Sequence, residues 1–180
     1  GREDVGAGPY LAVPPTGRPA LVRPAGCRLA VGLCWAGRPS HRNDRHRSAG
    51  LKPFLPLLGR AEVAFYSLQK GAAAAAVAEQ GVEGLVRDLS PVTEDLADLA
   101  HWASQLDLVI TVDTAVAHLA GALGVPCWVV LPWLVDWRWG REGDDTPWYG
   151  RMHLFRQPRP GDWTAVFGLV DEALGQVLGG

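Results

Sequence analysis

The sequence predicts an α/β domain in which helices cover both faces of a mainly parallel sheet. Short apolar runs alternate with segments of helical periodicity along residues 28–180. Most of these runs have strand length and contain few polar residues, which is typical of strands buried on both faces of a sheet. Together the two observations favour the doubly wound, Rossmann-like class, with about six strands.

Six apolar runs supply the strands of the expected sheet. The clearest are LVITV and CWVVL, in which β-branched residues favour an extended backbone. In chain order, the expected strands are residues 29–35, 63–68, 85–89, 108–112, 127–131 and 152–155.

Helix signals lie between these runs. Thr93 and Asp162 are expected to cap helices through their side-chain oxygens, and Gly124 is expected to end one. An alanine run after Gly71 is a strong helix former. In chain order, the expected helices are residues 48–59, 71–80, 93–106, 114–123 and 162–178.

Composition and charge exclude several classes of function. The chain has 180 residues and a formal net charge of −2, so no overall positive field attracts nucleic acid. It contains no run of about 18 apolar residues and no apolar signal-peptide core near residue 1, so we expect no membrane span and a cytoplasmic location. Residues 1–27 are rich in Pro and Gly and are expected to be an interdomain linker or lead-in.

Several cofactor and enzyme motifs are missing from the sequence. The three cysteines form no Cys-x-x-Cys pair, and no metal-ligand spacing stands out, so no metal site is expected. No G-x-G-x-x-G follows the first strand and no P-loop is present, which argues against an NAD domain and a P-loop NTPase. G-x-S-x-G is also absent, which weakens a hydrolase interpretation.

Polar residues gather directly after the expected strands, where ligands of open parallel sheets bind. Gly37 follows the first strand and permits a close approach of a ligand to the backbone. Residues 38–47 carry four Arg and two His, and guanidinium groups suit phosphate oxygens. The alternative for this segment is a solvated basic loop. Gln69 and Lys70 follow the second strand.

The segment DTAVAH, at residues 113–118, is the sharpest local feature. The strand ends at Asp113, and Thr114 and Ala115 open a helix whose free amides and positive dipole favour a phosphate. His118 falls about one turn later on the same face, within reach of a phosphate or an acceptor hydroxyl. The alternative is a helix cap followed by a histidine that is satisfied inside the fold.

Four tryptophans lie in the long segment after the fifth strand, at residues 133–150. Such side chains can stack on a base or a sugar. Packing of a long loop, or burial against another domain, is the favoured interpretation.

Five motifs, in order, resemble the C-terminal domain of bacterial proteins that join tetratricopeptide repeats to a glycosyltransferase family 9 (heptosyltransferase-like) domain. The motifs TPWY and LFRQP, at residues 146–149 and 154–158, are similar too, and the resemblance covers about residues 29–178. The five motifs are VGLCWAG at 31–37, HRNDR at 41–45, SLQKG at 67–71, DTAVAHLAGALG at 113–124 and DWRW at 136–139.

The resemblance implies one half of a GT-B fold, the C-terminal half that binds a nucleotide-sugar donor, over residues 28–180. It implies a metal-independent glycosyltransferase for hexosyl or heptosyl transfer, with a nucleoside-diphosphate sugar as substrate and no cofactor. Arg42 and His118 would be catalytic. The implied donor-binding residues are Gly37, Arg42, Asn43, Arg45, Gln69, Lys70, Asp113, Thr114, Ala115 and His118.

The sequence departs from the pattern of the family in two ways. Ala115 stands where heptosyltransferases usually have Gly, and its methyl group limits the approach of a phosphate. Only one Rossmann-like half is present, so the chain is expected to be a fragment or a one-half protein that is inactive alone. Its expected partners are an N-terminal half-domain or tetratricopeptide repeats on the same polypeptide. The alternatives are a non-catalytic interaction module of a repeat protein and a nucleotide-sugar epimerase.

Overall fold

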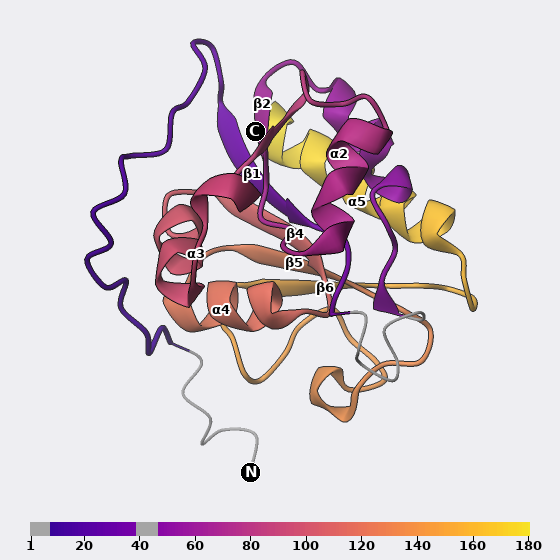
Figure 1. Cartoon of the computed structure of the whole chain (residues 1–180). Coiled ribbons are helices and arrows are strands. Elements are labelled where there is room, and N and C mark those ends of the chain that lie inside the picture. The colour runs from indigo at the N-terminus through magenta and orange to yellow at the C-terminus, as the bar shows by residue number, and fades with distance from the viewer. Residues whose placement is uncertain (1–7, 39–46) are drawn as a thin grey trace.

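Within the described residues, 8–38 and 47–180, six strands form one parallel sheet in the order β3-β2-β1-β4-β5-β6 (Figure 1). The structure is a computed structural model, and it confirms the predicted sheet. The chain builds outward from β1 to β3 and then crosses to the other side of β1 to form β4. Strand order therefore reverses between β1 and β4, whose following loops diverge. The strands are β1 (Leu29–Cys34), β2 (Val63–Ser67), β3 (Val86–Asp88), β4 (Leu108–Val112), β5 (Cys127–Leu131) and β6 (Met152–Arg156).

The connections contain α-helices and short 3-10 helices. The helices are η2 (Lys52–Gly59), η3 (Ala72–Ala75), α2 (Ala76–Glu79), η4 (Ser90–Val92), α3 (Leu96–Ala103), α4 (Ala115–Leu123), η5 (Trp137–Trp139) and α5 (Trp163–Gly179). Among the described residues, no helix combines the length and apolar character needed to cross a membrane.

Helices cover both faces of the sheet, as Figure 1 shows. On one face α3 and α4 pack over the strands, with Leu99 and Leu119 in a buried cluster. On the other face η2, α2 and α5 form a second cluster, in which the rings of Phe54 and Phe167 lie 4.4 Å apart. All five residues of β4 are buried, which fits the prediction of strands covered on both sides.

Two of the expected helices form differently. The segment expected at 48–59 is the 3-10 helix η2, because Pro53 lies in its first turn and Pro56 inside it, and neither residue can donate a backbone hydrogen bond. The alanine run begins as η3 and gives only one turn of α2. Gly81 follows with a φ of 66°, a left-handed conformation that a helix cannot continue through.

One predicted helix cap is wrong and two are correct, the N-cap Asp162 and Gly124, which ends α4 with a φ of 72°. Asp95, not Thr93, caps α3, because the Asp95 carboxylate accepts a hydrogen bond from the amide of Asp98 at 2.9 Å. The buried Thr93 hydroxyl donates instead to the carbonyl of Leu89, which draws it away from the helix. Asp162 caps α5 as expected, at 3.0 Å from the amide of Ala165.

The described part of the expected linker, residues 8–27, runs along α3 and α4 (Figure 1). The amides of Tyr10 and Leu11 donate to the carbonyl of Ala122 at the end of α4. The Arg18 guanidinium makes a bidentate pair with Asp98 of α3, with N–O distances of 2.9 and 2.6 Å. This strap, residues 8–27, is therefore fixed to the domain by backbone and side-chain bonds.

We predict that the Arg18–Asp98 pair makes the stability of the fold depend on acid pH. The hydrogen bond from Arg18 lowers the pKa of Asp98 to about 2, below the value of about 3.8 expected in the unfolded chain. The pair therefore stabilises the fold fully above pH 4, and this contribution is lost as the pH falls toward 2. Arg18→Met should lower the melting temperature at pH 7, and the difference from the unchanged chain should shrink at pH 3, as measured by circular dichroism.

Arg28→Met is the matched control, since the Arg28–Glu62 pair is longer, at 3.4 Å, and about half exposed on both sides. It should change the melting temperature little at either pH. An equal loss for Arg18→Met at both pH values would contradict the prediction.

Candidate functional site

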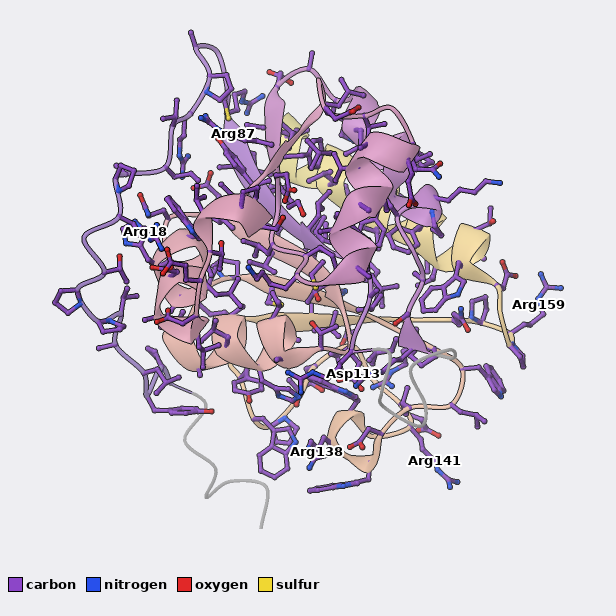
Figure 2. The ribbon with its side chains drawn as sticks, viewed as in Figure 1. Arg18, Arg87, Asp113, Arg138, Arg141 and Arg159 are labelled. Atoms are coloured by element: carbon purple, nitrogen blue, oxygen red, sulfur yellow. The ribbon has the colours of Figure 1, made fainter. Side chains whose placement is uncertain are left out.

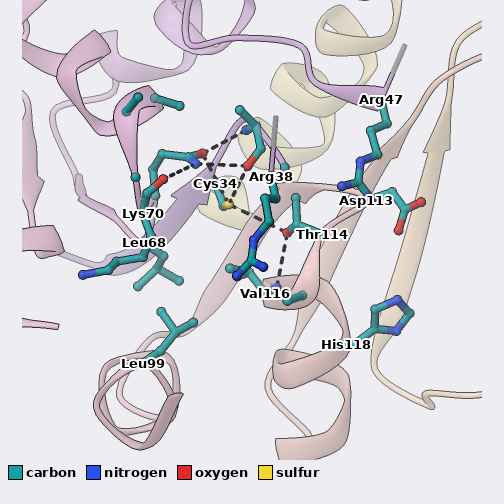
Figure 3. A pocket seen from close by; sticks show the side chains of 17 residues that line it. Cys34, Arg38, Arg47, Leu68, Lys70, Leu99, Asp113, Thr114, Val116 and His118 are labelled. Carbon is teal, nitrogen blue, oxygen red and sulfur yellow. Dashed lines mark hydrogen bonds between the residues drawn. The ribbon is translucent and has the colours of Figure 1, made fainter. Parts of the chain in front are cut away.

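A cavity of about 600 Å³ lies beyond the carboxyl ends of β1, β2 and β4 (Figure 3). This is the edge where strand order reverses, and the volume lies within the range of small-molecule sites. The walls come from the loops after β1 and β2, from the first turn of α4, and from Leu99 of α3. The cavity is thus where the polar residues after the strands were expected to meet.

Gln69 shapes the loop that follows β1. Its Oε1 accepts hydrogen bonds from the amides of Trp35 and Ala36 at 3.0 and 2.9 Å, and its Nε2 donates to the carbonyls of Ala36 and Lys70, both at 3.0 Å. The side chain is almost fully buried. Both hydrogens of the side-chain amide are used in these bonds. Gln69 therefore lines the cavity as a support for its wall and has no hydrogen left to donate to a ligand.

Lys70 lines the cavity from the next position along the chain. Its Nζ donates to the carbonyl of Ser90 at 3.0 Å and to that of Thr93. The amine therefore ties the loop after β2 to the segment after β3. One of its three hydrogens is left for another acceptor.

Thr114 is the N-cap residue of α4 and lines the cavity. Its hydroxyl accepts from the amide of Val116 at 3.2 Å and lies 3.0 Å from the hydroxyl of Thr111. The Cys34 thiol lies 3.7 Å from the same oxygen, and burial raises the pKa of this thiol. The Thr114 hydroxyl is therefore occupied as a helix cap, whereas the amide of Ala115, in the first turn, has no partner within the helix.

Three charged side chains, those of Arg38, Arg47 and Asp113, also line the cavity. Figure 3 shows Arg38 and Arg47 at the two ends of the loop after β1, with Asp113 below Arg47. Neither arginine was singled out from the sequence, although both lie within the Arg-rich segment that was expected to meet an anion. Gly37 also lines the cavity, and its amide donates to the Ser48 hydroxyl at 2.9 Å.

Three of the expected site residues, Arg42, Asn43 and Arg45, lie outside the described residues. The other expected residues all line this one cavity, contributed by loops and by α4. They are Gly37, Gln69, Lys70, Asp113, Thr114, Ala115 and His118.

His118 connects the cavity to the long loop over residues 133–150. Its ring stacks on Trp139 at 5.2 Å, with the planes inclined by 19°, and its Nδ1 lies 3.1 Å from the hydroxyl of Tyr149. Burial lowers the pKa of His118 below its ordinary value, with the charge of Asp113 opposing the shift. His118 is therefore a neutral imidazole at pH 7.

The loop over residues 133–150, called the aromatic loop below, has both buried and exposed tryptophans. Arg156 holds it in position. The guanidinium of Arg156, at the end of β6, donates to the carbonyls of Trp139, Gly140 and Gly143 at 2.6 to 3.2 Å. Trp139 is buried, as the packing interpretation expected, but Trp137 is 70% exposed. Asp113, Arg138 and Arg141 lie at the same edge of the molecule in Figure 2.

Comparison with known families supports the resemblance found in the motifs. Residues 59–129 match the family model described as Glycosyltransferase family 9 (heptosyltransferase). The similarity to this family is shown over these 71 residues. The link to tetratricopeptide repeats stays a prediction.

Solved structures share the fold of this chain. The structure of E. coli ADP-heptose lps heptosyltransferase II superposes with a TM-score of 0.61 at 15% identity, over 84% of this chain and 46% of that chain. The E. coli heptosyltransferase WaaC with ADP gives 0.61 at 19% identity, over 83% of this chain and 45% of WaaC. The chain therefore has the fold of about half of each of these structures.

One curated relative is similar in sequence. Protein FlbA of Caulobacter vibrioides is 32% identical over 152 residues, which are 80% of this chain and 24% of FlbA. The chain thus spans about a quarter of the length of this relative.

We predict that Gly121 is required for the contact between α4 and the aromatic loop. A Cβ at this position would lie 2.4 Å from the ring of Tyr149. Gly121→Ala should therefore destabilise the chain by about 1–3 kcal/mol, because overpacking outweighs the gain in helix propensity. Urea unfolding measures the change.

Gly168→Ala is the matched control, since Gly168 is exposed on α5 and a Cβ there meets nothing within 4 Å. It should stabilise the chain by up to about 1 kcal/mol. Stabilisation by both substitutions would contradict the packing argument.

Proposed function

We propose that this chain is the donor-binding part of a glycosyltransferase and that its cavity holds the nucleoside diphosphate of a nucleotide sugar. The observation that carries the proposal is the position of the cavity. It lies at the reversal of strand order, between the Arg-bearing loop after β1 and the first turn of α4. The match to glycosyltransferase family 9 agrees with this assignment.

The diphosphate would lie between Arg38, Arg47 and the start of α4. The amide of Ala115 and the positive end of the helix dipole favour an anion there. Guanidinium groups add charge-assisted hydrogen bonds. These groups together supply the positive charge that a diphosphate needs.

The nucleoside would occupy the less polar end of the cavity. Leu68 and Leu99 lie near each other at this end of the cavity in Figure 3, and apolar walls suit the faces of a base. Because the E. coli WaaC structure was obtained with ADP, ADP is the first nucleotide to test.

Catalysis would depend on stabilising the leaving group. As the glycosidic bond breaks, negative charge develops on the β-phosphate, and preorganised amides and guanidinium groups would stabilise that charge. The Asp113 carboxylate repels phosphate and is better matched to a hydroxyl of the sugar. Of the two residues expected to be catalytic, His118 lines the cavity and Arg42 lies outside the described residues.

Transfer would need residues beyond this chain, which spans under half of the heptosyltransferase structures it resembles. We propose that an acceptor-side half-domain on the same polypeptide supplies the general base. Tetratricopeptide repeats are a further proposed partner. The chain alone should therefore bind a nucleotide without transferring a sugar.

A second candidate is a non-catalytic interaction module. Its support is the exposed apolar surface beside the cavity, where Trp133, Leu134 and Trp137 are 52, 80 and 70% exposed. Exposed aromatic groups of this kind mark protein interfaces. If Asp113→Ala leaves the activity of the full-length protein unchanged while Trp137→Ala abolishes it, the module is favoured over the transferase.

We predict that the chain binds ADP and that binding depends on Arg38 and Arg47. Removing both guanidinium groups in Arg38→Gln/Arg47→Gln should weaken binding about a hundredfold or more, since each of the two charge-assisted hydrogen bonds contributes about 1.5–3 kcal/mol. Isothermal titration calorimetry measures the affinity, with UDP and GDP as comparisons.

Arg87→Gln is the control, because Arg87 is exposed on β3 and lies far from Asp113 in Figure 2. It should leave the affinity unchanged. If none of the three nucleotides gives a heat of binding at millimolar concentration, the proposed donor site is contradicted. If Arg87→Gln loses the same affinity, the loss comes from overall charge and not from Arg38 and Arg47.

A further inference from the structure

The aromatic loop holds the ring of His118 without lining the cavity itself. None of residues 133–150, all of which the structure describes, contributes to the cavity wall. Trp139 nevertheless stacks on the His118 ring, and the Tyr149 hydroxyl approaches its Nδ1. The Tyr149 ring lies against Gly121, almost one turn further along α4. The loop thus acts on the cavity through one side chain.

The contact between His118 and Tyr149 permits two arrangements of protons. Either the phenol donates to Nδ1, or an Nδ1 proton is donated to the phenol oxygen. Burial raises the pKa of Tyr149 to about 12, and burial lowers the pKa of His118, so both groups are neutral at pH 7. A phenol is a stronger acid than a neutral imidazole N–H, and an imidazole nitrogen is a stronger base than a phenol oxygen. The first arrangement is therefore lower in energy.

We propose that Tyr149 is a positioning residue: its hydroxyl donates to Nδ1 of His118 and keeps the ring proton on Nε2, so that His118, which lines the cavity, offers an Nε2–H donor to a ligand. Among the described residues, Nε2 has no hydrogen-bond partner. The identity of the acceptor rests on the proposed function, in which it is an anionic oxygen of the diphosphate. The opposite tautomer would present a lone pair to that oxygen and repel it.

Tyr10 of the strap interacts with Tyr149 and, like burial, raises its pKa. Tyr10 is 65% exposed. Its hydroxyl is not part of the bond between Tyr149 and His118, so Tyr10 offers a comparison for Tyr149.

The hydrogen bond is tested directly by NMR of the full chain with ¹⁵N-labelled histidine, without any ligand. At a pH where His118 is neutral, the proton should be on Nε2, and the Nδ1 shift should be that of a hydrogen-bonded acceptor. Tyr149→Phe keeps the ring against Gly121 and should move the Nδ1 shift to that of a free acceptor. Tyr10→Phe is the same chemical change at the neighbouring tyrosine of the strap, and it should leave the Nδ1 shift unchanged. A proton on Nδ1, or no change in Tyr149→Phe, would overturn the proposal.

The link to binding is tested by a double-mutant cycle with ADP as the probe. Tyr149→Phe should weaken ADP binding about two- to tenfold, the value of one hydrogen bond, and should have no further effect in a His118→Ala background. Additive losses would mean that Tyr149 does not act through His118, which contradicts the positioning role. If the unchanged chain does not bind ADP, the proposed function fails, together with the diphosphate as acceptor. The NMR result decides the His118–Tyr149 bond in either case.

Discussion

The reversal of strand order between β1 and β4 is the constraint on which the site depends. Two neighbouring strands send their loops in opposite directions, and the space between them becomes the cavity. A parallel sheet alone does not keep that space open. The carboxamide of Gln69 does so by bonding the backbone after β1, while Thr114 caps α4 on the other side.

Much of the fold could be predicted from the sequence because burial leaves a simple pattern. β4 and β5 are runs of apolar residues withdrawn from water on both faces, and their bounds agree with the expected ones. Helix ends were harder to predict. Asp95 and Thr93 both have an oxygen that can cap a helix. The choice between them depends on where the Thr93 hydroxyl bonds, which is the carbonyl of Leu89 four residues earlier.

The position of the candidate site could be predicted from the sequence, but the role of each side chain in it could not be predicted. Position after a strand identified Gln69 and Lys70, yet both bond to the protein backbone, which no local pattern reveals. The stacking of Trp139 on His118 joins residues from separate elements, so the hydrophobic periodicity of the sequence does not predict it. Composition did single out the arginine-rich segment, and its described ends, Arg38 and Arg47, line the cavity. Anion binding by this segment stays a prediction.

The bonding of Gln69, Lys70 and Thr114 has an evolutionary consequence. These polar side chains are occupied in holding loops, so the groups left toward the cavity include main-chain amides, which every residue except proline carries. Where such an amide meets a ligand, selection acts on the path of the backbone more than on the chemical identity of the residue that carries it. Sequences can then drift apart widely while the architecture persists, which agrees with the 15 and 19% identity between this chain and enzymes of the same fold.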